Sequence, residues 1–330
     1  MKIAIVKLNT LGDIIHTMPV LQFIKKKIDN IDIDWIVDKS LSSILSYNPH
    51  IDNIIKVDLQ KITKNKFSLF SEIKKIKDNY DTNYDLIIDT QGNLISATIS
   101  KMLGKNSIGF SASSIKNKFA PLFYKEKIDV DFEKSFVDRN CELVSKALDI
   151  QITQEEILNK EPFLFYKKRL RLNTCFNIFR KNIVFVIGST WASRNYPKEN
   201  FAKLADMLKE NVMIIWGNEK ERERAEWIEK NTLYAKSLPK LSLNALKEVI
   251  DGADLVIGND TGPTHMAWAL NRKSITIFGP TSENRVYQTP INRVIKSKSA
   301  VNMHKINKKD FSIKDIDPKD IYNIAQELLY

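Results

Sequence analysis

Residues 7–24, KLNTLGDIIHTMPVLQFI, join a short apolar run to an amphipathic segment through a loop that contains a glycine and an acid. In the run before them, KIAIV at 2–6, all residues from Ile3 to Val6 are apolar, so both faces of an extended strand would be apolar, as expected of a strand covered on both faces. The apolar residues after the loop recur at helical spacing and predict a helix over 14–28. A strand, loop and helix in this order open a doubly wound α/β domain.

The same unit recurs along the chain. Seven more Ile- and Val-rich runs have strand length: DIDWIVD (32–38), NIIKVD (53–58), YDLIIDTQG (84–92), KNIVFVIGS (181–189), NVMIIWGN (211–218), ADLVIGND (253–260) and SITIFGP (274–280). Helical patterns alternate with them over 71–79, 94–103, 134–148, 198–210, 219–230, 242–251, 262–270 and 318–329. This alternation predicts an α/β fold of two Rossmann-like, doubly wound parallel-sheet domains.

The 330 residues suffice for two domains. Residues 150–180 are a polar, basic connector, so we expect domains at 1–165 and 166–330, with the final amphipathic helix able to pack on either. The N-terminus shows no secretion signal, and no apolar run approaches the roughly 18 residues of a membrane span, which predicts a cytoplasmic protein. Cys141 and Cys175 have neither zinc-site nor disulfide-framework spacing and are expected to be buried free thiols.

The formal net charge of +11 favours anionic partners: nucleic acid, anionic lipid or phosphorylated substrates. Residues 55–127 hold 13 lysines, no arginine and 7 acidic residues, a local excess of +6. Aromatic residues lie among them, at Phe67, Phe70, Phe119, Phe123 and Tyr124. This stretch is either an ordinary solvated face or a surface that docks on an anionic layer.

The loop at 12–13 admits two interpretations. Gly12 allows close approach of the backbone, and Asp13 lies where the helix begins, so its carboxylate could cap the helix. The same carboxylate could act as a general base, because ligands of parallel sheets bind at the carboxyl ends of the strands.

The second half offers an anion site. In ADLVIGNDTGPTHMAWAL (253–270), Asp260, Thr261 and Gly262 precede a helix that begins near Pro263, and His265 falls in its first turn. Free N–H groups at a helix start suit a diphosphate, although the same residues also serve simple helix initiation. Ser189, Thr190 and Arg194 follow another strand and could hold the same diphosphate. Glu221, after a third strand, could bind ribose hydroxyls.

Several established motifs are missing. The first strand is not followed by GxGxxG, and GxxxxGK[ST], HExxH and GxSxG do not occur. Dehydrogenase, P-loop, metalloprotease and α/β-hydrolase functions therefore lose their main support.

Taken together, GDIIHTMPVL (12–21), DTQGN (89–93), VDRNCELVSKAL (137–148), GNDTGPTHMAWAL (258–270) and FGPT (278–281) resemble the heptosyltransferases that act on lipopolysaccharide, glycosyltransferase family 9. The resemblance spans nearly the whole chain. It implies a GT-B fold, in which an N-terminal acceptor domain and a C-terminal ADP-heptose domain face a cleft.

The resemblance also implies a mechanism and a set of residues. Asp13 is the base of an inverting transfer that uses neither a metal nor a cofactor. The acceptor side is expected at Gly12, Gln91, Gly92, Asn93 and Arg139. The donor site is expected at Ser189, Thr190, Arg194, Lys198, Glu221, Leu241, Asp260, Thr261, Gly262 and His265. Arg194 stands where the family usually has lysine, so charge is kept and geometry changes, with Lys198 as a possible substitute.

Within the family, the resemblance is to enzymes that add the first heptose to the Kdo of Kdo-lipid A. It implies a monomer at the cytoplasmic face of the inner membrane, bound peripherally, with ADP-heptose and Kdo-lipid A as partners and no nucleic acid. The alternatives are addition of a second or third heptose, a sugar-nucleotide epimerase, a non-catalytic nucleotide-sugar-binding envelope protein, and a DNA-binding protein. The basic residues do not cluster on a recognition helix, which disfavours DNA.

Overall fold

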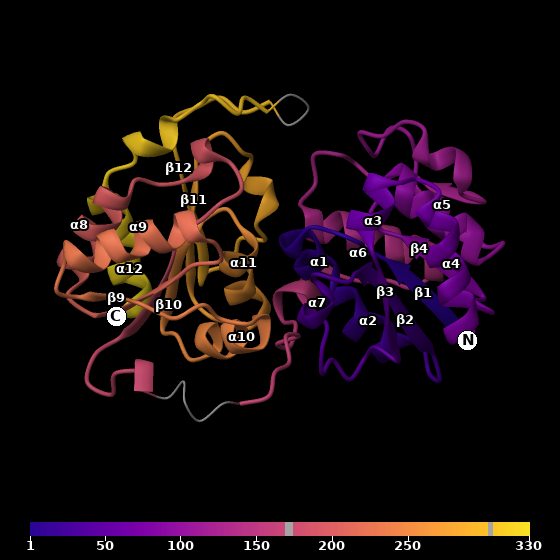
Figure 1. Ribbon diagram of the computed structural model, residues 1–330, viewed down its shortest axis with the longest axis horizontal. Helices are drawn as coiled ribbons and strands as arrows, with labels where there is room; N and C mark the ends of the chain where they lie inside the picture. Colours follow the sequence, from indigo (N-terminus) through magenta and orange to yellow (C-terminus); the bar gives the residue numbers. More distant parts are fainter. Residues whose placement is uncertain (169–173, 303–305) are drawn as a thin grey trace. The chain divides into compact units, whose positions relative to one another are not determined.

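The computed structural model describes residues 1–168, 174–302 and 306–330. The chain divides into two compact units, Met1–Phe163 and Leu164–Tyr330, each with a six-stranded sheet and packed helices (Figure 1). The division falls after Phe163 rather than after residue 165.

The first sheet is parallel throughout, in the order β3-β2-β1-β4-β5-β6. Its strands are β1 (Lys2–Val6), β2 (Asp32–Asp38), β3 (Asn53–Val57), β4 (Leu86–Asp89), β5 (Ser107–Phe110) and β6 (Glu126–Ile128). The helices are α1 (Leu11–Thr17), α2 (Pro19–Lys27), α3 (Leu59–Lys64), α4 (Ser68–Asn79), α5 (Leu94–Leu103), α6 (Phe136–Leu148) and α7 (Gln154–Leu158), with 3-10 turns η1 (Ser42–Ile44) and η2 (Ala120–Phe123).

The strand order fixes where a ligand can bind. After β3 the chain crosses to the other side of β1, and β4 pairs with β1 so that Ile3 lies opposite Leu86. The connections after β1 and β4 therefore leave the sheet in opposite directions. The gap between them, outside the carboxyl ends of both strands, is the switch point at which open α/β sheets bind ligands.

The predicted helix at 14–28 is two helices. The first begins earlier, at Leu11, and ends at Thr17, and the second begins at Pro19. Proline has no N–H to continue the ladder and its ring crowds the preceding turn, which ends α1, whereas a first helical position tolerates it.

The second sheet is also parallel, in the order β12-β11-β10-β7-β8-β9, so its switch point lies between β10 and β7. Its strands are β7 (Asn182–Val186), β8 (Asn211–Ile215), β9 (Ala235–Ser237), β10 (Leu255–Asn259), β11 (Ser274–Phe278) and β12 (Asn292–Lys296). The helices are α8 (Lys198–Leu208), α9 (Glu219–Lys230), α10 (Leu243–Asp251), α11 (Gly262–Ala269) and α12 (Pro318–Leu329), with 3-10 turns η4 (Ala192–Arg194), η5 (Glu283–Arg285) and η6 (Ser312–Asp315).

The eight runs predicted as strands are β1–β4, β7, β8, β10 and β11, and the expected pair of doubly wound sheets is confirmed. The pattern missed β5, β6, β9 and β12, because these are short or lie at sheet edges with polar residues. Helix α12 packs within the second unit: Ile321, Ala325, Leu328 and Leu329 lie in the core that β7 and α8 also form.

Candidate active site

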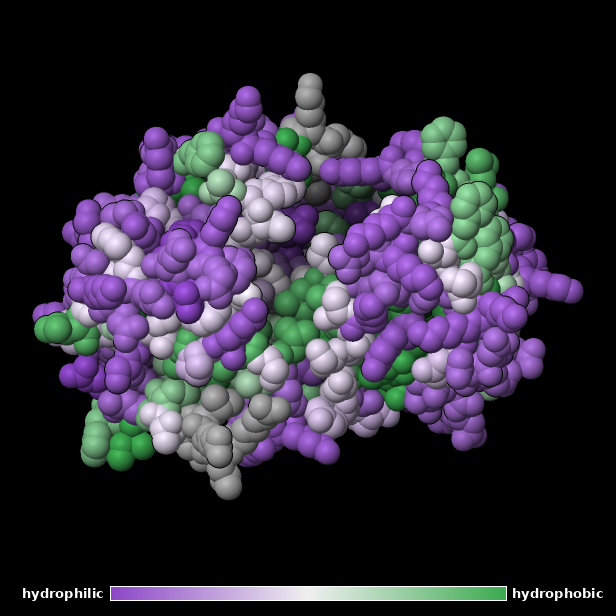
Figure 2. Space-filling view, in the orientation of Figure 1, coloured by the Kyte–Doolittle hydropathy of each residue, from purple (hydrophilic) through white to green (hydrophobic). Residues whose placement is uncertain are grey.

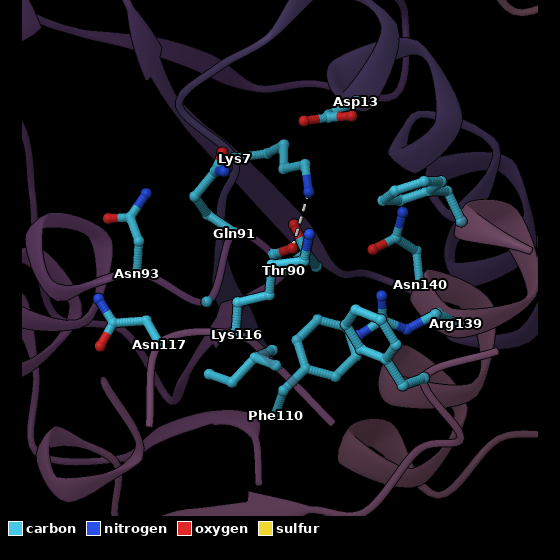
Figure 3. A pocket seen from close by; sticks show the side chains of 14 residues that line it. Lys7, Asp13, Thr90, Gln91, Asn93, Phe110, Lys116, Asn117, Arg139 and Asn140 are labelled. Atoms are coloured by element: carbon cyan, nitrogen blue, oxygen red, sulfur yellow. Dashed lines mark hydrogen bonds between the residues drawn. The ribbon is translucent and has the colours of Figure 1, made fainter. Parts of the chain in front are cut away.

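A cavity of about 300 Å³ lies at the switch point of the first unit (Figure 3). Of the residues expected from the sequence, Asp13, Gln91, Gly92, Asn93 and Arg139 line it. The other lining residues, which the sequence analysis missed, are Lys7, Thr90, Phe110, Ile115, Lys116, Asn117, Phe132, Phe136 and Asn140. Gly12, expected on the acceptor side, is outside this lining set and occupies the second position of α1.

Asp13 occupies the third position of α1 and is half-buried. The helix cap is Thr10, and the Thr10 backbone N–H donates to Asp13 Oδ2 at 3.4 Å. Asp13 was wrongly expected at the N-cap position, because the helix begins three residues earlier than its apolar pattern indicated, but its carboxylate does accept a backbone N–H at the helix start. The carboxylate reaches back to the start of its own helix and also borders the cavity.

Lys7 is one of the cations that line the cavity with Asp13. It follows β1, is buried, and its ammonium donates to the backbone carbonyl of Thr90 at 2.8 Å. Burial lowers the pKa of the ammonium, while the carboxylates of Asp13 and Asp89 act in the opposite direction. Figure 3 shows Lys7 between Asp13 and Arg139. A lysine directly after an apolar strand was the sequence signal for this residue.

Arg139, on α6, is the second cation of the cavity. Its guanidinium lies 5.1 Å from the ring centroid of Phe110 and 5.0 Å from that of Phe132, and it donates to the backbone carbonyl of Ser114. Burial lowers the pKa of this guanidinium, with Asp131 acting in the opposite direction. Stacking between two rings holds the charge at the cavity in a fixed orientation.

The β4 loop is tied to the β1 loop. Gln91 Oε1 accepts the backbone N–H groups of Leu8 at 3.2 Å and Asn9 at 3.1 Å. The buried carboxylate of Asp89 in turn accepts the N–H groups of Gln91 at 2.8 Å and Gly92 at 3.1 Å. These bonds fix the backbone on both sides of the switch point.

Two further loop residues shape the cavity. Gly92 has φ of +69°, which disfavours any side chain, and a Cβ there would lie 3.0 Å from Ile115 Cγ2. Asn93 caps α5, and its Oδ1 accepts the N–H of Ser96 at 3.0 Å.

In the second unit, Asp260 is the centre of a cluster at the carboxyl ends of β10, β7 and β11. Its Oδ2 lies 2.8 Å from Arg194 Nη2 and 3.3 Å from Arg285 Nε, and accepts from Thr281 Oγ1 at 2.9 Å. Its Oδ1 lies 3.1 Å from His265 Nε2. Arg194 and His265 were expected from the sequence, whereas Arg285 and Thr281, which follow the predicted strand at 274–280, were not.

The Asp260 carboxylate is held in its charged form. Burial by itself raises the pKa of this carboxyl. The charge of Arg285, the hydrogen bond with His265 and the charge of Arg194 outweigh that effect and place the pKa below its ordinary value. Two guanidinium groups share one carboxylate, so the cluster keeps a positive charge beside the first turn of α11, where Thr261 is the cap and Gly262 the first residue.

The loop after β7 bears Ser189, Thr190 and Arg194, and Arg194 reaches the Asp260 carboxylate. Asn259, at the end of β10, orders that loop: its Oδ1 accepts the N–H of Tyr196 at 3.0 Å, and its Nδ2 donates to the Ile187 carbonyl at 2.8 Å. The hydroxyl oxygen of Ser189 is buried without a hydrogen-bond partner among the described residues.

Glu221 lies at the start of α9, beside the loop after β8. Its Oε2 accepts the Gly217 N–H at 2.7 Å, and its Oε1 accepts from Asn218 Nδ2 at 2.8 Å. A Cβ on Gly188 would collide with this carboxylate. The absence of a side chain at Gly188 therefore lets the loop after β7 approach the start of α9.

Lys198 and Leu241 complete the set of expected donor residues. The Lys198 ammonium is 4.4 Å from the ring centroid of Trp227 on α9, so the structure does not bring it to the Asp260 cluster as a substitute for Arg194. Leu241 is half-buried in the loop between β9 and α10. Within residues 1–168, 174–302 and 306–330, no group of three His, Cys, Asp or Glu side chains is arranged to hold a metal ion.

Each unit thus presents polar loops at the switch point of a Rossmann-type sheet. The chain belongs to glycosyltransferase family 9, described as heptosyltransferase, whose model matches residues 73–319. It is therefore a glycosyltransferase.

Among individual relatives, lipopolysaccharide heptosyltransferase 1 of Campylobacter coli is 36% identical, with 99% of each chain covered. Lipopolysaccharide heptosyltransferase 1 of Pseudomonas aeruginosa is 30% identical over 86% of this chain and 79% of its own. Lipooligosaccharide heptosyltransferase 2 of Haemophilus influenzae is 25% identical over 86% of this chain and 84% of its own.

Solved structures have the same fold. E. coli heptosyltransferase WaaC with ADP has a TM-score of 0.81 at 24% identity, covering 99% of this chain and 100% of its own. A family 9 glycosyl transferase from Veillonella parvula has a TM-score of 0.84 at 19% identity, covering 99% and 97%. The fold class expected from the sequence, GT-B, is confirmed.

Proposed function

We propose that this protein transfers heptose from ADP-heptose to the Kdo of Kdo-lipid A, with inversion at the anomeric carbon and without a metal ion or cofactor. The observation that carries the proposal is the Asp13 carboxylate at the rim of a cavity that also holds the cations Lys7 and Arg139. A base beside the two buried cations suits an acceptor that carries both a hydroxyl to be deprotonated and a negative charge.

In this mechanism Asp13 takes the proton of the acceptor hydroxyl. The oxygen attacks the anomeric carbon of heptose, and the bond from that carbon to the diphosphate oxygen breaks on the opposite face. ADP leaves with the electron pair. Lys7 and Arg139 hold the acceptor's negative charge, and the loop fixed by Gln91 keeps the hydroxyl within reach of the base.

On the donor side, Arg194 and Arg285 face the charge that develops on the leaving diphosphate, together with the N–H groups at the start of α11. Ser189 and Thr190 supply hydroxyl donors. Glu221 binds the ribose hydroxyls with the carboxylate lone pairs that are not used by its hydrogen bonds from Gly217 and Asn218. Leu241 lines the adenine pocket. Asp260 contributes to donor binding by holding the guanidinium groups of Arg194 and Arg285 in place.

The names of the relatives support addition of the first heptose. The identity is 36% to the heptosyltransferase 1 of Campylobacter coli and 30% to that of Pseudomonas aeruginosa, and 25% to the heptosyltransferase 2 of Haemophilus influenzae. Addition to an already heptosylated core is the alternative within the same family.

We further propose that the protein is a monomer that works at the cytoplasmic face of the inner membrane as a peripheral protein. Among the described helices, none combines the length and the apolar character that crossing a membrane requires. The lysine-rich, aromatic stretch at 55–127 supports docking on an anionic leaflet.

The test is mass spectrometry of Kdo-lipid A after incubation with the protein and ADP-heptose in the presence of EDTA. One added heptose, lost in Asp13→Asn, is the expected result. No addition to Kdo-lipid A, but addition to a heptosylated core, would assign the protein to a later step. No transfer to either acceptor would contradict the proposal.

A further inference from the structure

A second cavity lies next to the proposed acceptor site. It has about 500 Å³ and is bordered by α3, α4, α5 and the loop at 117. Its apolar lining consists of Ile62, Leu69, Leu94 and Ile95, with Thr63, Lys66, Asn93, Thr98 and Asn117 as its polar members. The mechanism proposed above uses none of its apolar side chains.

The groove adjoins the acceptor cavity. Asn93 and Asn117 line both spaces. A molecule whose sugar reaches Asp13 can therefore extend past these two asparagines into the groove. This shared border favours a part of the acceptor itself as the occupant over an independent ligand.

The surroundings of the groove are apolar and exposed. Phe67 is 80% exposed, Phe70 61%, Phe119 68% and Leu122 76%. They lie at the start of α4, in the loop before η2 and in η2, and both α4 and η2 pack on α5. Figure 2 shows apolar side chains gathered on the surface over α5. Exposed aromatic rings in such a group are typical of a surface that meets a membrane or a lipid.

The charge around the groove is positive. Lys66 lines it, and Lys64, Lys116 and Lys118 lie within two residues of lining positions. Glu72, the acidic residue of the first turns of α4, is buried and lies 3.6 Å from the ammonium of Lys61. An apolar groove rimmed by lysines complements a lipid with hydrocarbon chains and an anionic head.

We propose that this groove binds an acyl chain of the acceptor glycolipid while its sugar occupies the Asp13 cavity. The lysines at the rim contact the anionic part of the same molecule, and Phe67, Phe70, Phe119 and Leu122 rest in the leaflet that supplies it. The acyl chain is then drawn from the bilayer only as far as the groove requires. This inference rests on the proposed function, because it takes the acceptor to be an acylated glycolipid.

The experiment compares two acceptors, Kdo-lipid A in mixed micelles and the same acceptor with its acyl chains removed, and measures the ratio of their kcat/KM values. Leu69→Asn places an amide in the groove and Thr98→Trp fills it. Each is expected to lower the preference for the acylated acceptor by about tenfold, which is the affinity that one buried leucine contributes. Leu158→Asn, at a residue 52% exposed and outside the groove, is the matched control and should leave the ratio unchanged.

The outcomes separate the two proposals. If wild-type protein transfers heptose to neither acceptor, the proposed function fails. If it uses both acceptors and the groove variants, folded as judged by their melting curves, keep the wild-type ratio, the groove is not an acyl-chain site. If the variants instead lose binding to acceptor-free vesicles of anionic phospholipid and keep the ratio, the groove contacts the bilayer only, which also overturns the assignment.

Discussion

The guanidinium of Arg194 lies 2.8 Å from the carboxylate of Asp260, and both side chains are buried, with 9% and 1% of their surface exposed. Arg285 approaches the same oxygen at 3.3 Å. An acid that is charged and shared between two arginines is a poor proton acceptor. Asp260 is therefore unsuited to act as a base, which supports the proposal that Asp13, at the border of a cavity, has that role.

Arg285→Gln is expected to raise the dissociation constant of ADP about tenfold, because it removes a charge-assisted hydrogen bond to the diphosphate. Isothermal titration calorimetry measures it. Arg293→Gln is the matched control, since Arg293, on β12, is exposed and pairs with Glu327 of α12 at 2.5 Å. Unchanged ADP affinity in a folded Arg285→Gln protein would remove this residue from the donor site.

Gly188→Ala is expected to weaken ADP binding by at least about fivefold, because the new Cβ displaces the Glu221 carboxylate from its place beside β7. Gly217→Ala is the control on the other side of the same carboxylate. A Cβ there meets Glu221 Oε2 at 3.5 Å, an ordinary contact, so the affinity should change by less than about twofold. Equal effects of the two substitutions would contradict the proposed ribose contact.

Asp13→Asn is expected to lower kcat by about 10²–10⁴-fold, the contribution typical of a general base. The amide oxygen of asparagine can still accept the Thr10 N–H, so the melting temperature and the affinity for ADP-heptose should stay near wild type. Single-turnover kinetics and a thermal melt measure the two effects. A variant that loses stability and activity together would indicate that Asp13 serves only the start of α1.

The stability of the first unit should depend on pH through Lys160. This lysine follows α7, its ammonium lies 5.1 Å from the ring centroid of Phe163, and burial lowers its pKa to about 7. Below that pH the group is charged in both the folded and unfolded chain, and the cost of burying the charge is fully present. Between pH 7 and its ordinary value of 10.5 the unfolded chain binds more protons, so stability rises with pH.

Lys160→Met should accordingly raise the free energy of unfolding by at least about 1 kcal/mol at pH 6 and by less at pH 10. Urea denaturation at both pH values measures it. Lys168→Met, at an exposed lysine of the connector, should change stability by less than about 0.5 kcal/mol at either pH. If Lys160→Met changed the free energy of unfolding equally at both pH values, the pKa of Lys160 would not be lowered in the folded protein.

The sequence by itself determined the central strands, the alternation with helices and the two loops that bear Asp13 and Asp260. These features are local: a buried parallel strand needs apolar residues on both faces, and a helix start needs its own N–H groups satisfied. Motif likeness then indicated the family. The edge strands β6, β9 and β12 were not predicted, because few of their side chains are buried and their apolar pattern is therefore weak.

Only the tertiary structure decided which polar residues meet. Lys7 and Arg139 are far apart in the sequence, and the sheet order brings β1 and α6 to one cavity. Arg285 reaches Asp260 because β11 pairs with β10. The tertiary structure also placed α12 in the second unit and Lys198 on Trp227 rather than at the Asp260 cluster. Such contacts depend on strand order and on the burial of charge, and neither is encoded in any short stretch of residues.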